Sequence, residues 1–127
     1  MMSIKASARG VRMSPRKVGV VAALVRGRTV SDAVTILSHT PRRSAQPVRK
    51  LIESIKANAE NNNNMLPDTL VLSHISVTPG ERIKRFRPVA RGMAHPYQLR
   101  SSHIFVEVTG EKRQPKPSKT STTEKKK

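Results

Sequence analysis

The chain has no cysteine and no tryptophan, and aromatic residues make up 2% of its 127 positions. The absence of cysteine excludes disulfides and thiolate metal ligands, and it fits a reducing compartment. Because aromatic residues are scarce, a core must be built mainly from Val, Ile, Leu and Ala. No apolar run approaches the roughly 20 residues of a membrane-spanning helix, and the amino-terminal segment lacks the apolar stretch of a secretory signal. We therefore expect an unprocessed intracellular protein that does not associate with membranes.

Acidic residues are also scarce, with 8 Asp and Glu against 25 Lys and Arg. They are too few and scattered for a catalytic carboxylate pair, and the sequence has no Gly-rich phosphate loop and no Ser/His/Asp arrangement. The histidines are far apart and lack partners at ligand spacing, although His74 and His103 could meet across two strands. The sequence therefore predicts no enzyme, no catalytic residue, no metal site and no cofactor. The four histidines are His39, His74, His95 and His103.

The chain instead carries a formal charge of +17. Charge of this density repels itself in a small protein, so a neutralising polyanion is expected in the working state. Nucleic acid is the partner that this charge favours. At 127 residues, the chain is long enough for one compact domain with a modest core.

The most informative segment is a basic stretch between two strand patterns. It contains a single acid, Glu81, two prolines, one glycine and few large apolar side chains, so it cannot bury itself in its own domain. We interpret it as the extended arm of a β-hairpin, about residues 79–102, with its tip at residues 89–94, where Gly92 supplies the turn. With only Phe86 and Tyr97 for base stacking, the arm favours recognition of RNA by shape and backbone. The cations of this stretch are Arg82, Lys84, Arg85, Arg87, Arg91 and Arg100.

Three helices are predicted in the amino-terminal half. Ser14-Pro15 is a helix-start signal, with the hydroxyl as cap, and Gly27 ends the run. A second helix is predicted to start at Ser31, and a third at residues 40–41 or just after Pro47, with its end at residues 61–64. The apolar positions recur at helical spacing. Their inward residues are predicted to be Val18, Val21, Ala22, Val25, Ala33, Val34, Leu37, Val48, Leu51, Ile52, Ile55 and Ala59.

Alternating apolar residues predict strands over residues 70–77 and 104–108, and residues 4–11 are expected to add a third strand. The predicted fold is α+β: three helices on one face of a small antiparallel three-stranded sheet, with a long protruding hairpin. Residues 1–109 form the domain, and residues 110–127 form a lysine-rich tail expected to be disordered and to act as an electrostatic tether. From the sheet, the predicted core takes Val71, Ile75, Val77, Ile104 and Val106.

Five short blocks occur in an order that resembles the bacterial large-subunit ribosomal protein twenty-two family. They are Ser14-Pro15-Arg16-Lys17-Val18, Val25-Arg26-Gly27-Arg28, Ala57-Asn58-Ala59-Glu60-Asn61, Lys84-Arg85-Phe86-Arg87-Pro88 with Ala90-Arg91-Gly92, and Ser102-His103-Ile104. The resemblance covers about residues 4–108. It implies a structural constituent of the large ribosomal subunit that binds large-subunit rRNA, aids its assembly and lines the nascent-peptide exit tunnel with its hairpin tip.

The resemblance also implies partners and site residues. The partners are large-subunit rRNA, neighbouring ribosomal proteins including ribosomal protein four near the tunnel constriction, and the nascent polypeptide; no homo-oligomer is expected. The location is the cytoplasmic ribosome, and an organellar ribosome also fits. The implied rRNA-binding residues are Arg9, Arg12, Arg16, Lys17, Arg26, Arg28, Arg82, Lys84, Arg85, Arg87, Arg91, Arg100 and His103. The implied tunnel-lining tip is Pro88, Val89, Ala90, Arg91, Gly92, Met93, Ala94 and His95.

Some positions depart from the family or stay open. Met93 stands where the family usually has an arginine, Val89 and Gly19 stand where basic residues are common, and Pro96 removes a backbone donor from the returning strand. Arg42 and Arg43 fit solvated surface and RNA contact equally well. Two other functions would make different demands on the sequence: a DNA-compacting protein would need a dimer or a recognition helix, and a cationic membrane-surface protein would need an amphipathic helix with aromatic anchors.

Overall fold

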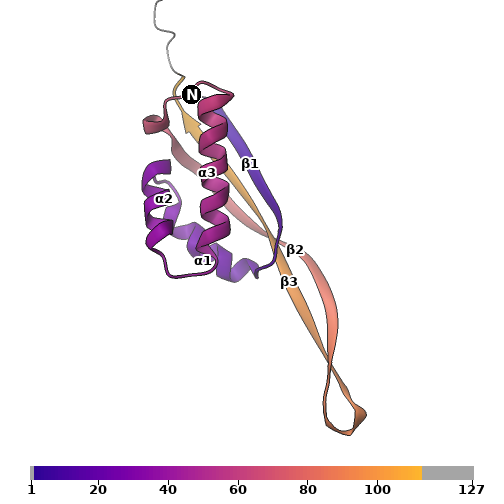
Figure 1. The fold of residues 1–127 in the computed structure, drawn as a ribbon. Coiled ribbons are helices and arrows are strands. Elements are labelled where there is room, and N and C mark those ends of the chain that lie inside the picture. The colour runs from indigo at the N-terminus through magenta and orange to yellow at the C-terminus, as the bar shows by residue number, and fades with distance from the viewer. Residues whose placement is uncertain (1, 113–127) are drawn as a thin grey trace, which may run out of the picture.

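The computed structural model describes residues 2–112 and has the predicted α+β fold (Figure 1). Three helices precede the long hairpin, and short 3-10 turns stand before it and at its tip. The elements are β1 (Met2–Val11), α1 (Pro15–Val25), α2 (Val30–His39), α3 (Ala45–Asn61), η1 (Pro67–Thr69), β2 (Val71–Pro88), η2 (Ala90–Gly92) and β3 (Ala94–Gly110).

The sheet is antiparallel, in the order β1-β3-β2, so β3 pairs with a strand on each side. The predicted third strand at the amino terminus is therefore confirmed, and it pairs with residues 102–110 of β3. Beyond Val11, β3 keeps only β2 as a partner, and the two strands continue together to the Pro88–Ala94 pair. This two-stranded continuation projects away from the helices as a narrow arm (Figure 1).

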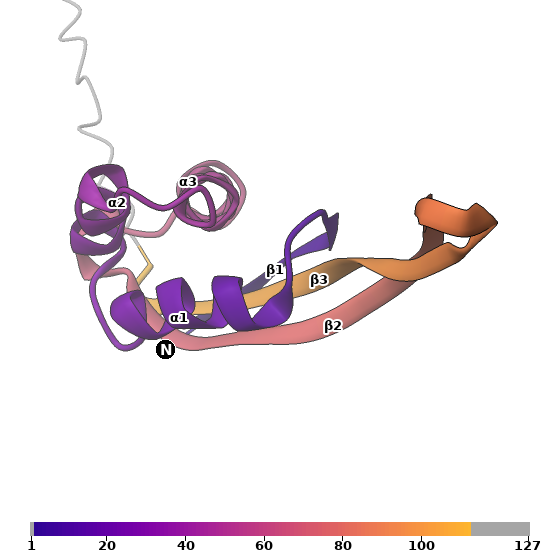
Figure 2. The same cartoon turned by 90° about the horizontal axis from the view of Figure 1, so that it is seen from below.

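Helices α1 and α3 pack against the sheet, and Figure 2, seen from below, shows α2 and α3 on the same side of it. Every residue predicted to face inward from α1 and α3 is buried, and Val18, Val21, Ala22 and Val25 are the buried residues of α1. In α2 the prediction is only partly right, because Val34 is partly buried and Val30 is buried. Both Ile52 and Ile55 of α3 are completely buried, as is Ile104 of β3. The core is thus aliphatic, and it lies between the helices and the part of the sheet in which β1 pairs with β3.

Two predicted helix starts are wrong. Thr29, not Ser31, is the N-cap of α2, and its hydroxyl accepts a hydrogen bond from the Asp32 backbone N–H at 3.2 Å. Helix α3 begins at Ala45, so Pro47 lies inside its first turn. The first four N–H groups of a helix have no partner within the helix, so a proline there breaks no hydrogen bond.

One predicted core residue is also wrong, since Val71 is 37% exposed and Leu72 is buried in its place. The cause is an irregularity in the β2–β3 register between Leu72 and His74, which shifts the alternation of faces along β2. Val77 is only partly buried. The same register pairs His74 with Glu107 and Thr78 with His103, so the two histidines do not meet across the strands.

A second register irregularity, between Pro79 and Arg82, marks the root of the arm. Here the backbone of β2 passes close to β3: a Cβ added to Gly80 would lie 2.6 Å from the Ser101 hydroxyl oxygen. That hydroxyl donates a hydrogen bond of 2.8 Å to the Glu81 carbonyl. An irregular pair of this kind bends a strand and increases its twist, so it helps to set the direction in which the arm leaves the domain.

The carboxy-terminal end of the described chain is still tied to the domain. Gly110 is buried as the last residue of β3, and the Glu111 carbonyl accepts a hydrogen bond from the Leu66 N–H at 3.0 Å. Lys112 forms a β-bridge with Met65. The predicted tail therefore starts with residues that belong to the fold, and the rest of that prediction, residues 113–127, lies outside the described residues.

Candidate nucleic-acid interface

The arm, defined here as residues 82–100, is solvent-exposed along its whole length. Two strands alternate their side chains between two faces, and in the arm both faces are basic. Arg82 stands directly opposite Arg100 on the face that continues the helix-covered side of the sheet, and Lys84 follows on the same face. Because like charges at directly opposite positions destabilise a strand pair, this stretch is built for a partner that supplies negative charge.

The opposite face of the arm combines arginine with the single tyrosine of the chain. Arg85 pairs with Tyr97 in the strand register, and the Arg87 guanidinium carbon lies 5.6 Å from the centre of the Tyr97 ring. This distance is within the range of a cation–π contact. Phe86, on the other face, is 74% exposed. The arm therefore offers two aromatic surfaces for stacking, and its remaining contacts are suited to phosphates.

The tip is a tight turn whose position agrees with the prediction. Gly92 has φ +70°, and η2 is closed by a hydrogen bond of 2.9 Å from the Val89 N–H to the Met93 carbonyl. Arg91 also has a left-handed backbone, with φ 61°. This conformation costs a non-glycine residue roughly 1–2 kcal/mol, and it occurs at an exposed residue at the end of the arm.

Several predicted RNA-binding residues of the domain also hold the fold together. Arg26 donates from its guanidinium to the Ile75 carbonyl at 3.1 Å, and Arg28 donates to the Leu24 carbonyl at 3.1 Å. His103 accepts a hydrogen bond from the Gly10 N–H at its Nδ1, at 3.0 Å. Arg9 and Arg16 are exposed. Arg26, Arg28 and His103 are thus fixed in position by protein contacts before any partner binds.

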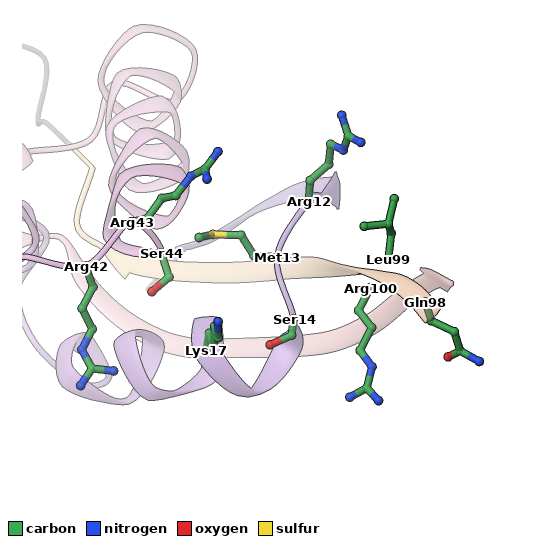
Figure 3. A pocket seen from close by; sticks show the side chains of 10 residues that line it. All are labelled: Arg12, Met13, Ser14, Lys17, Arg42, Arg43, Ser44, Gln98, Leu99 and Arg100. Carbon is green, nitrogen blue, oxygen red and sulfur yellow. The ribbon is translucent and has the colours of Figure 1, made fainter. Parts of the chain in front are cut away.

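A cleft of about 640 Å³ gathers another set of the predicted cations. Its walls come from the β1–α1 connection, the α2–α3 connection and the base of the arm (Figure 3). The structure brings Arg12, Lys17 and Arg100 together here, with Arg42 and Arg43, whose role the sequence left open. The lining residues are Arg12, Met13, Ser14, Lys17, Arg42, Arg43, Ser44, Gln98, Leu99 and Arg100.

The sequence carries one signal that Arg42 and Arg43 bind an anion. They follow Pro41 and directly precede Ser44, the N-cap of α3, and cations are unfavourable at that end of a helix unless an anion balances them. Paired arginines at such a position therefore indicate a bound anion better than they indicate solvated surface. Their closeness to the arm, in contrast, comes from the fold alone.

Acidic side chains neutralise the domain more than the arm. Among the described residues, the ion pairs join Lys5 to Glu107, Arg49 to Glu53 and Lys56 to Glu60, and all of them lie outside the arm. Within residues 2–112, no group of three or more His, Cys, Asp or Glu side chains is placed to hold a metal ion. The described helices are all too short or too polar to cross a membrane.

Comparison with known proteins places this architecture among proteins of the ribosome. Residues 6–109 match the family described as ribosomal protein L22p/L17e. The chain is 47% identical over 111 residues to the large ribosomal subunit protein uL22 of Oceanobacillus iheyensis, a match that covers 87% of this chain and 98% of that protein. It is 46% identical over 112 residues to the protein of the same name from Desulfitobacterium hafniense strain Y51, with 88% and 98% covered. The matched residues include the helices and the entire arm.

Proposed function

The chain belongs to the ribosomal protein L22p/L17e family, and from this membership we propose how it works as a structural constituent of the large ribosomal subunit. The domain binds large-subunit rRNA at the surface of the folded RNA, and the arm passes between RNA segments that would otherwise repel each other. Its role is architectural, because positive charge on two faces of a thin ribbon joins phosphates on both sides.

The observation that carries this proposal is the arm itself. It is a two-stranded ribbon that is exposed from residue 81 to residue 100 and basic on both faces. With about 3.4 Å per residue in an antiparallel strand, the seven pairs from Arg82–Arg100 to Pro88–Ala94 extend roughly 24 Å from the root. A ribbon of this length buries no apolar core of its own, so contacts with RNA must supply the energy that orders it.

The geometry favours structured RNA over duplex DNA. Arginine forks bind two phosphate oxygens or stack on exposed bases, and both modes suit a fixed path between RNA helices. A DNA-compacting protein would read a groove with a helix or a dimer, whereas the exposed cations here lie along a two-stranded arm and around the cleft at its base. We therefore propose rRNA as the partner and reject DNA compaction as the function.

The tip lines the nascent-peptide exit tunnel in this proposal, close to ribosomal protein four, as the family resemblance implies. The tip residues are exposed, and the turn at Arg91 and Gly92 closes the arm with a small cross-section. Met93 is 67% exposed, so this chain presents a flexible thioether to the passage at a position where the family commonly places a guanidinium.

The test is photocrosslinking from two positions in assembled large subunits. One variant carries a photoreactive residue in place of Met93 at the tip, and the matched variant carries it in place of Lys50, an exposed residue on α3. The proposal predicts that both proteins sediment with the large subunit. The tip variant should crosslink to nascent polypeptide and tunnel rRNA, and the Lys50 variant should not crosslink to nascent polypeptide.

Two results would contradict the proposal at different levels. Protein found free, or bound to DNA, would remove the ribosomal assignment of this chain. Protein that sediments with the large subunit but gives no nascent-chain crosslink from position 93 would leave the subunit assignment intact and remove the tunnel-lining role of the tip.

A further inference from the structure

The cleft at the base of the arm has a composition that requires an anion. Five of its lining side chains are cations, and no acidic side chain of the described residues lines it. Its cations come from three segments that are distant in sequence, so their mutual repulsion opposes the packing of those segments. The neutralising group must therefore come from a partner molecule. The five cations are Arg12, Lys17, Arg42, Arg43 and Arg100.

Two helices also begin at the wall of this cleft. Ser14 and Ser44 are the N-caps of α1 and α3, and both line the cleft. Neither serine side chain makes a capping hydrogen bond, and the first turns of both helices contain no acidic residue. Ser44 is 4% exposed. The positive dipole ends of two helices thus add to the charge of the five side chains.

The third helix provides an internal comparison. Helix α2 starts away from the cleft, and Thr29 caps it through the Asp32 N–H. Asp32 also places a negative charge in its first turn. The chain therefore provides its own capping group and acid where a helix start faces away from the cleft, and it omits both where two helix starts face the cleft. This pattern is the one expected if an external anion occupies the position.

The position of the cleft gives the anion a mechanical role. Gln98, Leu99 and Arg100 on one wall belong to the arm, whereas Arg42 and Arg43 on another wall belong to the connection between α2 and α3 (Figure 3). The arm is otherwise joined to the domain through its two strands, which are irregular in register between Pro79 and Arg82. A phosphate chain in the cleft attracts both walls at once and draws the arm base toward the helices.

We propose that this cleft binds consecutive phosphates of one RNA strand and that this binding fixes the angle of the arm relative to the helical domain. The inference rests on the proposed function, because it takes the RNA to be large-subunit rRNA. It goes further by separating two tasks of the basic surface. The arm contacts RNA along its path, whereas the cleft is a clamp that sets the direction of that path.

The first test measures how many phosphate contacts the cleft makes. The probe is the transcribed large-subunit rRNA of Oceanobacillus iheyensis, whose uL22 is 47% identical to this chain. Arg42→Gln/Arg43→Gln removes two charges from the cleft, and Lys50→Gln/Lys112→Gln removes two exposed charges elsewhere. Each lost phosphate contact lowers the slope of log affinity against log salt by about 0.7–0.9. We expect a loss of about 1.4–1.8 in the cleft variant and no change in the control.

The second test measures the angle of the arm directly. Because the chain has no cysteine, Ser54→Cys on α3 and Ile83→Cys on the arm give two unique positions for spin labels. Both side chains are exposed. In the otherwise native protein, the inter-label distance distribution should become narrower when rRNA binds. With Arg42→Gln/Arg43→Gln added, rRNA bound at low salt should leave the distribution as wide as in the free protein.

The outcomes separate the clamp from the proposed function. If the native chain does not bind the rRNA, both are overturned. If it binds and the cleft and control variants have the same salt slope, the rRNA assignment stands and the clamp is overturned. The clamp is also overturned if the label distribution stays unchanged on binding, or becomes equally narrow in the cleft variant. Inorganic phosphate that competes at millimolar concentration would show a site for free phosphate in place of an RNA strand.

Discussion

The hairpin consists of two regions that share one backbone ladder and differ in the side chains that it carries. In the domain half, residues 71–79 and 102–110, the face toward the helices carries Ile75, Ile104 and Val106, all buried. In the arm half, residues 82–88 and 94–100, the same face carries Arg82 and Arg100, both exposed. The comparison shows that strand pairing alone does not decide where folding energy resides. Buried apolar side chains stabilise the domain half, whereas the exposed cations of the arm half are suited to bind a partner.

The largest contrast is expected from the same substitution made in the two halves. Ile104→Ala removes a fully buried side chain and should lower the free energy of unfolding by about 2–5 kcal/mol. Ile83→Ala removes a side chain that is 43% exposed on the arm and should cost about 0.5 kcal/mol. Urea denaturation followed by circular dichroism measures both. A cost above about 2 kcal/mol at Ile83 would mean that the arm contributes to the core, and the comparison would fail.

A second contrast compares the effect of one variant on stability with its effect on RNA affinity. Arg82→Gln/Lys84→Gln/Arg85→Gln removes three cations that have no carboxylate partner among the described residues. The stability should change by less than about 0.5 kcal/mol, whereas affinity for large-subunit rRNA at moderate salt should fall about a hundredfold, with a salt slope smaller by about 2–3.

The matched control for the arm variant is Arg49→Gln/Lys50→Gln/Lys56→Gln, which gives the same net charge through changes on α3. Two of these cations are paired with Glu53 and Glu60 at i,i+4 spacing, so their loss should cost a few tenths of a kcal/mol each. Its salt slope should remain near that of the native chain. Equal slopes in the two triple variants would show that the arm acts only through total charge.

The sequence predicts the elements whose signal is local. Helical spacing of aliphatic residues identifies the buried stripes of α1 and α3, and the basic, proline-containing stretch identifies the arm, because neither inference needs to know what lies opposite. The exposure of Val71 was not predictable in this way, since it depends on an irregularity in a register that forms only when β2 pairs with β3. The start of α3 was missed because proline is unfavourable in a helix interior but tolerated in the first turn.

The candidate site divides along the same line. The cations of the arm lie close together in the sequence, so its composition alone predicts that they form one binding surface. The cleft is assembled from three segments around residues 12–17, 42–44 and 98–100, and no local pattern records that they converge. What the sequence does carry is the residue types of each segment, namely serines and arginines at helix starts. The predicted cap by the Ser14 hydroxyl is wrong, because the Ser14 side chain makes no capping hydrogen bond.

The smallest predicted effect lies at the boundary between the two halves, at Ser102. This residue is fully buried, and its hydroxyl has no hydrogen-bond partner in the part of the chain that the structure describes. Its neighbour across the strands is Pro79, which has no N–H to offer. An unsatisfied buried hydroxyl is unfavourable, so Ser102→Ala should raise the free energy of unfolding by about 1 kcal/mol.

The adjacent serine provides a control of opposite sign. The Ser101 hydroxyl donates to the Glu81 carbonyl at 2.8 Å, so Ser101→Ala should lower the free energy of unfolding by about 0.5–1 kcal/mol. Thermal and urea unfolding of the two variants give the comparison directly. A loss of stability in both would mean that the Ser102 hydroxyl has a hydrogen-bond partner in solution.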